Sequence, residues 1–205
     1  MRRPLRNFSI RLVLFAAILL ALGRVYGTAK VTPLLPALAW VIETVDDHFR
    51  VDRMSIVNRK ADTYIELKVT PIRLLMRGHR VLIPDAKLFF APSTLLGSVL
   101  QSIILFLAIL LAWPCARLWA FFARLLLAVP MIALLLVTNV PLGFVGVMLD
   151  FRQNYPDIPV APLAYWNDFL QTGGPLALAI AASVLVVSAA DRWIPSSVSA
   201  KLTKA

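Results

Sequence analysis

The sequence has one cysteine, Cys115, which excludes an intramolecular disulfide and every CxxC motif for metal or redox chemistry. It also lacks GxxxxGK(S/T), HExxH, GxSxG and GxGxxG, the local motifs of phosphate, zinc, serine-hydrolase and dinucleotide sites. Charge is scarce, because only 16% of the 205 residues are charged, against about 25% in a usual soluble domain. Function therefore has to be inferred from topology and loops.

Apolar residues are abundant instead: they make up 60% of the chain, and the mean hydropathy is +0.78. A helix that crosses the hydrocarbon core of a bilayer needs roughly 20 mainly apolar residues. Residues 94–113, 125–149 and 175–190 are uncharged runs that we interpret as spans, and Pro130 and Pro141 are expected to kink the second of them. The composition predicts an integral membrane protein.

The N-terminal apolar segment is shorter, with twelve residues between Arg11 and Arg24. Its length and basic start also fit a cleaved secretory signal peptide. We favour an uncleaved signal anchor over residues 1–29, because the Arg24 side chain can reach the membrane surface and Val25 and Tyr26 extend the apolar stretch. Either interpretation sends the next segment out of the cytoplasm.

Basic residues set the orientation, since short cytoplasmic loops are enriched in Lys and Arg. Nine of them fall on one side of the predicted spans: Arg2, Arg3, Arg6, Arg11, Arg117, Arg124, Arg192, Lys201 and Lys204. This places both termini of a multi-pass membrane protein in the cytoplasm. The net charge of +10 then indicates contact with lipid headgroups and no nucleic-acid partner.

Residues 30–91 form an exported block with mixed α and β patterns. Helical spacing over residues 34–49 predicts an amphipathic helix, formed by Leu35, Leu38, Ala39, Ile42, Val45 and Phe49. Residues 63–69 alternate as a half-buried strand, with Ile65, Leu67 and Val69 on one face, and residues 51–57 form a weaker strand before a polar turn. A further hairpin is expected around residues 77–80. A small α+β domain is predicted.

Two exposed regions are candidates for partner binding. Arg73, Arg77 and Arg80 form a basic patch on the hairpin, although a solvated hairpin tip gives the same pattern. Tyr165, Trp166 and Phe169 follow an extended Pro-rich stretch in the loop of residues 150–174, where docking into the membrane interface is the alternative. We predict these six residues as the partner-binding set.

Catalysis is not expected from the residues present. Cys115 lies at the cytoplasmic end of the second span, whereas both histidines, His48 and His79, are predicted outside, about a membrane thickness away. A metal corner formed by His48 with Asp46 and Asp47 is the alternative, but adjacent residues on a helix end do not share one face, which favours a solvated helix terminus. We therefore predict no catalytic residue, no metal ligand and no cofactor.

Polar residues inside the spans are the other place where function is expected. Asn139, followed by Pro141, is the best candidate for a functional break, because proline frees a backbone carbonyl that the amide can satisfy. A hydrogen bond between Asn139 and Gln101 that holds two helices together is the alternative.

The whole pattern resembles a known family. The signal anchor, the exported domain with its TYIELKV strand, the three-helix membrane bundle and the WNDFLQTGG segment before the last span are together similar to the exosortase H-associated membrane proteins of Gram-negative bacteria. The resemblance implies an accessory protein of a protein-sorting system, whose partner is a polytopic cysteine transpeptidase-like enzyme. No catalytic residue is carried over, because Cys115 lies on the wrong side.

The predicted fold is a polytopic α-helical membrane protein of about four transmembrane helices, with a small α+β exported domain between the first two. The expected parts are an anchor (1–29), the exported domain (30–91), a three-helix bundle (92–193) with an exported loop (150–174), and a cytoplasmic tail (194–205). The expected function is that of a non-enzymatic inner-membrane accessory subunit with membrane lipids and an exosortase-like enzyme as partners. The alternative is a membrane subunit of a transport or envelope-biosynthesis complex, which polar residues lining a cavity between the spans would favour.

Overall fold

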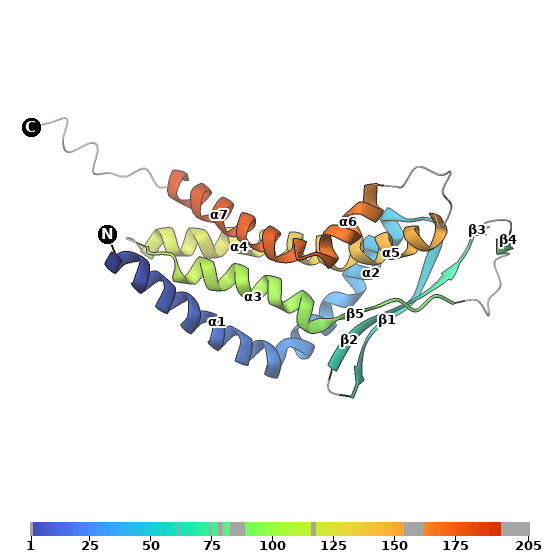
Figure 1. The fold of residues 1–205 in the computed structure, drawn as a ribbon, viewed down its shortest axis with the longest axis horizontal. Coiled ribbons are helices and arrows are strands. Elements are labelled where there is room, and N and C mark those ends of the chain that lie inside the picture. The colour runs from blue at the N-terminus through green and yellow to red at the C-terminus, as the bar shows by residue number, and fades with distance from the viewer. Residues whose placement is uncertain are drawn as a thin grey trace, which may run out of the picture.

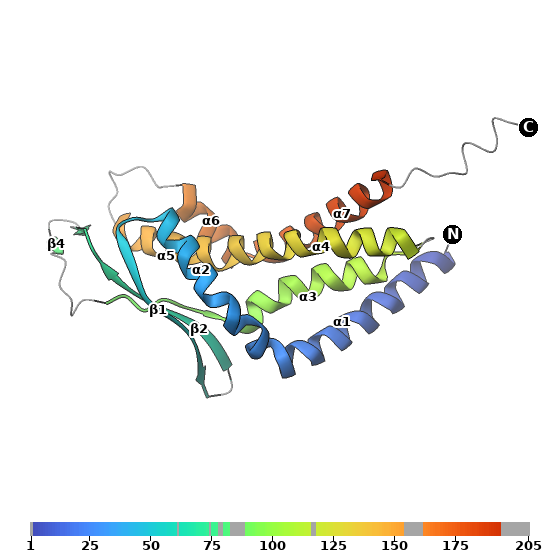
Figure 2. The same ribbon diagram turned by 180° about the vertical axis from the view of Figure 1, so that it is seen from behind.

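The computed structural model places a long helical bundle beside a small sheet (Figure 1). It describes residues 2–60, 62–73, 75–77, 80–82, 89–115, 118–153 and 162–193. The first helix begins and the last helix ends at the same end of the bundle, and the sheet lies at the opposite end (Figures 1 and 2). We call these the terminal end and the sheet end.

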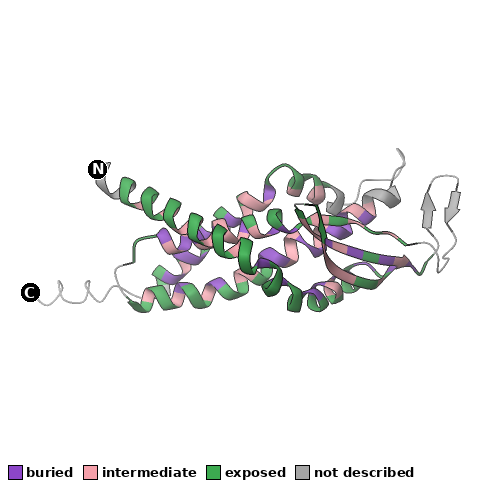
Figure 3. Ribbon diagram, turned by 90° about the horizontal axis from the view of Figure 1, so that it is seen from below, coloured by how far each residue is buried: buried purple, intermediate pink, exposed green. Residues whose placement is uncertain are grey.

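Four helices build the bundle: α1 (Arg2–Val31), α3 (Leu96–Ala112), α4 (Leu118–Asn139) and α7 (Gly174–Trp193). Helix α3 packs against both α1 and α7, and α4 packs against α7. The interface of α3, α4 and α7 is an apolar cluster whose buried residues are Phe106, Leu110, Ala128, Leu135, Ala179, Ala182, Val186 and Val187. By contrast, α1 is exposed along most of its length (Figure 3).

Three helical segments are long and apolar enough to cross a membrane by length and composition: Arg6–Val45, Leu118–Leu149 and Gly174–Arg192. The second predicted span, α3, has 17 residues and is about 25 Å long at about 1.5 Å per residue. It is shorter than a hydrocarbon core of about 30 Å. The count of four spans stays a prediction.

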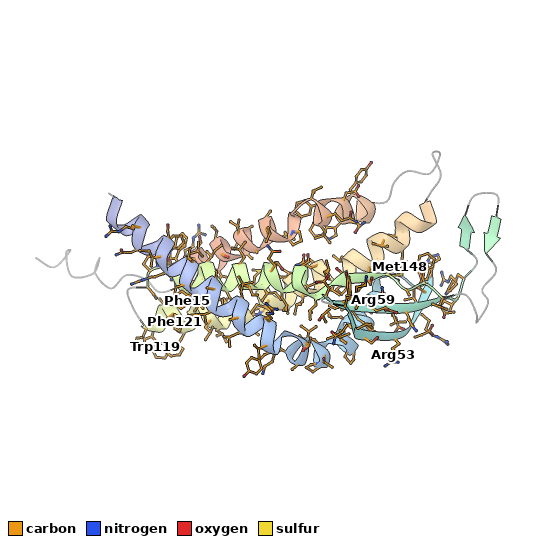
Figure 4. The ribbon with its side chains drawn as sticks, turned by 60° about the horizontal axis from the view of Figure 1, so that its bottom comes forward. Phe15, Arg53, Arg59, Trp119, Phe121 and Met148 are labelled. Atoms are coloured by element: carbon orange, nitrogen blue, oxygen red, sulfur yellow. The ribbon has the colours of Figure 1, made fainter. Side chains whose placement is uncertain are left out.

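Exposed aromatic side chains mark the terminal end. Trp119 and Phe121, at the start of α4, lie there, whereas the labelled arginines Arg53 and Arg59 lie on the sheet (Figure 4). Tryptophan is enriched at the interface between membrane and water, which agrees with the predicted position of Trp119.

Helix α1 is longer than the predicted anchor and leads directly into the sheet end. It runs to Val31 and is followed by the short helix η1 (Thr32–Leu34) and by α2 (Leu35–Val45). A Cβ atom on Gly27 would lie 2.6 Å from Leu100 Cδ1 of α3. Glycine at this position therefore permits the close approach of α1 to α3, as small residues do between membrane helices.

The sheet has three antiparallel strands in the order β1 (Phe49–Arg59), β2 (Asp62–Pro71), β5 (Ser93–Leu95). The predicted alternation in β2 is confirmed, since Ile65, Leu67 and Val69 are fully buried. The weaker strand is also confirmed, as the longer β1, and its register with β2 ends at the pair Arg59 and Asp62. The short strand β5 had no signal in the sequence, because it is only three residues long.

A second antiparallel pair joins β3 (Leu75–Arg77) to β4 (Arg80–Leu82). This confirms the predicted hairpin around residues 77–80, although Gly78 and His79 lie outside the described residues. The hairpin lies at the far tip of the sheet end (Figure 1).

Helices α2 and α5 (Pro141–Gln153) pack on the sheet end and against each other. Helix α2 confirms the predicted amphipathic helix over residues 35–45, with Leu35, Leu38 and Ile42 buried, whereas Phe49 already begins β1. The apolar cluster of the sheet end includes β2 residues together with Phe144, Val145 and Met148 of α5.

The third predicted span is one helical segment, Leu118–Leu149, that is interrupted next to Pro141, where a kink was predicted. Helix α4 ends at Asn139, and α5 begins at Pro141. Proline has no N–H, so one helical hydrogen bond is missing there. The second half of this apolar run belongs to the core of the sheet end, where α6 (Pro162–Gln171) covers α5.

Candidate functional site

A half-open cavity of about 360 Å³ lies where the bundle meets the sheet end. Its walls come from α3, the junction of α4 and α5, α6, and the start of α7. The lining residues are Pro92, Ser93, Thr94, Ser98, Val99, Asn139, Val140, Gly143, Phe144, Val147, Asn167, Leu170, Gln171 and Pro175. Its volume falls within the range of about 300–1,000 Å³ that is usual for ligand sites.

The break between α4 and α5 brings Asn139 to this cavity. Helical hydrogen bonds continue on both sides of the break, from Val140 N–H to the Leu136 carbonyl at 2.9 Å and from Phe144 N–H to the Val140 carbonyl at 3.0 Å. The interruption of the helix is therefore confined to this point. Asn139 is the last residue of α4 and faces the wall formed by α3.

One end of the Asn139 amide is paired and the other is not. Its Nδ2 donates to Ser102 Oγ at 3.0 Å, and Ser102 Oγ donates to the Val99 carbonyl at 2.9 Å. Its Oδ1 is buried without a hydrogen-bond partner. The predicted interhelical hydrogen bond exists, but its partner is Ser102 rather than the expected Gln101, which is exposed.

The remaining polar groups of the lining are neutral. Hydroxyl groups come from Ser93, Thr94 and Ser98, and amides come from Asn167 and Gln171. These groups both donate and accept hydrogen bonds. Among the described lining residues none is ionisable at neutral pH, so this wall offers hydrogen bonds and apolar contact rather than proton transfer.

The predicted aromatic residues lie together on α6, beside the cavity. Trp166 Nε1 donates to the Thr138 carbonyl at 3.2 Å, and the rings of Trp166 and Phe169 have centroids 5.2 Å apart. A Cβ atom on Gly174 would collide with the Phe169 ring. Trp166 and Phe169 thus fix α6 against α4 and α7, whereas Tyr165 is 64% exposed.

The predicted arginines lie on another part of the sheet end. Arg73 donates to Asp47 Oδ2 at 2.7 Å, so an acidic neighbour offsets its charge. Arg77 and Arg80 face each other in the register of β3 and β4, but their side chains lie outside the described part of the structure. The three aromatic residues therefore lie together on α6, and one arginine of the basic patch, Arg73, is paired with Asp47.

Comparison with protein-family models, curated proteins and solved structures finds no match for this chain. The resemblance to the exosortase H-associated membrane proteins stays a prediction. Function is therefore argued from the geometry.

An ion pair between a buried arginine and a half-exposed aspartate at the terminal end was not predicted. Arg124 of α4 is only 5% exposed, and its guanidinium donates to Asp191 Oδ1 of α7 at 2.9 Å. It also donates to the carbonyls of Trp113 and Pro114, at 3.4 and 3.3 Å. Arg124 had been counted as a loop cation, but it lies within α4 and ties the end of α3 to α7.

Two further groups bear on chemistry. Cys115 is exposed just after α3, at the terminal end, whereas His48 directly precedes β1 at the sheet end (Figure 1). Asp46, Asp47 and His48 each offer one ligand-type atom, and these atoms lie within 4.8 Å of one another. Among the described residues, these are the three acidic, thiol or imidazole side chains that lie close enough together to share one ion.

Proposed function

We propose that this protein is a non-enzymatic accessory subunit of the bacterial inner membrane, and that its cavity binds an exported segment of a partner membrane protein. The orientation predicted from the basic residues puts the sheet end outside the cytoplasm. An exosortase-like sorting enzyme is the partner that the sequence resemblance implies. The cavity carries the proposal, because it combines polar and apolar groups at the end of a bundle whose α3, α4 and α7 interface is an apolar cluster.

The chemistry of the cavity fits an uncharged peptide segment. Asn139 Oδ1 is a buried acceptor without a donor, and buried acceptors in native proteins nearly always have one. A backbone N–H of a bound segment supplies such a donor. Neighbouring hydroxyls and the Asn167 and Gln171 amides can pair with further peptide groups, while Val147 and Leu170 offer apolar contact.

A polar cavity also favours the alternative, a subunit of a transport or envelope-biosynthesis complex. Towards the terminal end, however, α3, α4 and α7 enclose a packed apolar cluster that includes Phe106 and Leu135. A conduction path needs polar or water-filled surface through the bilayer. The described bundle interior therefore supports docking at one end more than passage through the chain.

A pair of matched glycine variants tests the proposal. Gly143→Leu places a large side chain in the cavity, where a Cβ atom would meet only Leu170 Cδ1 at an ordinary 3.5 Å. Gly97→Leu adds the same side chain where a Cβ atom has nothing within 4 Å, outside this cavity. Both substitutions replace a helical glycine, so their effects on the helix itself are similar.

The measurement is quantitative mass spectrometry of proteins that co-purify with the full chain in mild detergent. We expect a membrane protein that is retained by the wild type and by Gly97→Leu but reduced at least tenfold by Gly143→Leu. Equal retention by both variants at equal membrane levels contradicts a partner site in the cavity.

A further inference from the structure

Three side chains converge between the end of α2 and the start of β1: those of Asp46, Asp47 and His48. The chain leaves the helix at Val45, and Asp46 is extended, with φ −129° and ψ 105°. The assumption that adjacent residues on a helix end point apart therefore does not apply here. Both Asp46 Oδ1 and Asp47 Oδ1 lie 3.0 Å from His48 Nδ1.

Asp46 has a buried carboxylate, and one of its two oxygens lacks a hydrogen-bond partner among the described residues. Its side chain is 6% exposed, and its Oδ1 accepts from the backbone N–H of His48 at 3.0 Å as well as facing the imidazole. Among the described residues, its Oδ2 has no hydrogen-bond partner. A buried carboxylate is stabilised when it is paired with a cation or coordinates a metal.

Hydrogen bonding within the cluster does not satisfy all three groups. A neutral imidazole has one N–H, and Nδ1 cannot direct it at two carboxylate oxygens equally well. Each of the two carboxylate oxygens lies 3.0 Å from Nδ1, near the separation of about 3.3 Å between ligands of a tetrahedral zinc ion with bonds of about 2.0 Å. All three ligand atoms lie within 4.8 Å of one another, so one ion contacts them once the carboxylates turn toward it.

We propose that Asp46, Asp47 and His48 bind a divalent zinc-type cation through one carboxylate oxygen from each aspartate and Nδ1 of the histidine. An imidazole nitrogen beside two carboxylates favours zinc over calcium or magnesium, which prefer oxygen ligands. Three protein ligands leave one position for water or for a group from a partner.

The surroundings fit this assignment. Arg73 donates to Asp47 Oδ2, the oxygen that is not needed for the ion, and so orients the carboxylate as outer-shell partners do in metal sites. Asp47 is 62% exposed, which gives an ion access from solvent. The site also fixes the path of the chain, because the His48 carbonyl accepts from Ile72 N–H at 2.9 Å, which joins it to the end of β2.

Isothermal titration with Zn²⁺ tests the proposal on the full chain in detergent, prepared without a polyhistidine tag and stripped with a chelator. We expect one ion per chain, bound at least tenfold more weakly by Asp47→Asn and by His48→Gln. Glutamine retains a side-chain donor to Asp46 but has no imidazole nitrogen. Asp47 is exposed, so its variant keeps the test valid where a change at buried Asp46 prevents folding.

Asp62→Asn is the control, because Asp62 is an exposed carboxylate of the same sheet at the start of β2. The affinity of the Asp62→Asn variant for Zn²⁺ should equal that of the wild type. Zn²⁺ should also slow amide hydrogen exchange over residues 46–51 in the wild type and in Asp62→Asn, but not in His48→Gln. Absence of stoichiometric binding, equal binding by all variants, or tighter binding of Ca²⁺ than of Zn²⁺ overturns the assignment.

Discussion

Asn139 Nδ2 donates a hydrogen bond of 3.0 Å to Ser102 Oγ, and this bond joins the last residue of α4 to the first half of α3. Ser102 is itself fully buried and donates to the Val99 carbonyl. The bond therefore fixes the wall of the cavity exactly where the apolar run of α4 breaks. It leaves Asn139 Oδ1 without a hydrogen-bond donor among the described residues.

Removing this bond should loosen the junction. Double-mutant analysis with Asn139→Ala, Ser102→Ala and the double variant should give a coupling free energy of about 1 kcal/mol, because hydrogen bonds between membrane helices average about 0.6 kcal/mol and reach about 1.7 kcal/mol. The measurement is the free energy of unfolding in mixed micelles. Strictly additive effects of the two substitutions would show that the side chains are not coupled.

Arg124 and Asp191 should both stabilise the terminal end. Arg124→Ala removes three hydrogen bonds of a buried guanidinium and should lower the free energy of unfolding by about 2 kcal/mol. Asp191→Ala should also cost about 2 kcal/mol, because it leaves the Arg124 guanidinium, which is only 5% exposed, without its carboxylate. Arg192→Ala replaces an exposed neighbour and is the control. It should change the free energy of unfolding by less than about 0.5 kcal/mol. Equal effects of all three would argue against the pair.

Substitutions of the aromatic residues of α6 should differ in whether they loosen the packing of α6 or only weaken partner binding. Trp166→Ala and Phe169→Ala remove contacts that fix α6 against α4 and α7, so each should increase proteolysis or hydrogen exchange of α6 as well as weaken partner retention. Tyr165→Ala removes an exposed side chain and should weaken retention alone, since large aromatics often contribute about 2 kcal/mol at an interface. Partner retention unaffected by Tyr165→Ala would remove Tyr165 from the binding set.

The predicted orientation has a direct test with reporters that are active only in the periplasm. Fusions after Ala91 and Gly174 should be bright, and fusions after Pro114 and Ala205 should be dark, because the basic residues of the short loops should stay in the cytoplasm. A bright fusion at Ala205 contradicts the four-span topology.

The sheet was predictable because its evidence is local. Alternation of Ile65, Leu67 and Val69 with polar residues repeats every second position and needs no distant partner to be recognised. A break at Pro141 was also predicted, because proline interrupts helical hydrogen bonds. The burial of the residues after it was not predicted, since hydropathy counts apolar residues and does not show whether they face lipid or a sheet. Phe144 and Met148 are as apolar as a span requires, yet they are buried at the sheet end.

Side-chain partners that are far apart in the sequence could not be predicted. Arg124 lies 67 residues from its carboxylate, and Asn139 lies 37 residues from Ser102, so neither pair is visible in a local window. The group at His48 was named from the sequence, but its convergence was not predicted. Its residues are adjacent, but their convergence depends on α2 ending at Val45.

Site-specific photo-crosslinking from the cavity tests the central claim most directly. A photoreactive residue is placed at Val147, which lines the cavity, and at Val184, an exposed position on α7 as a control. After irradiation in intact cells, we predict that position 147 captures one discrete partner polypeptide, and that Gly143→Leu abolishes this adduct while Gly97→Leu retains it. Adducts at position 147 that contain only lipid, or that match those from position 184, would contradict a partner-binding cavity.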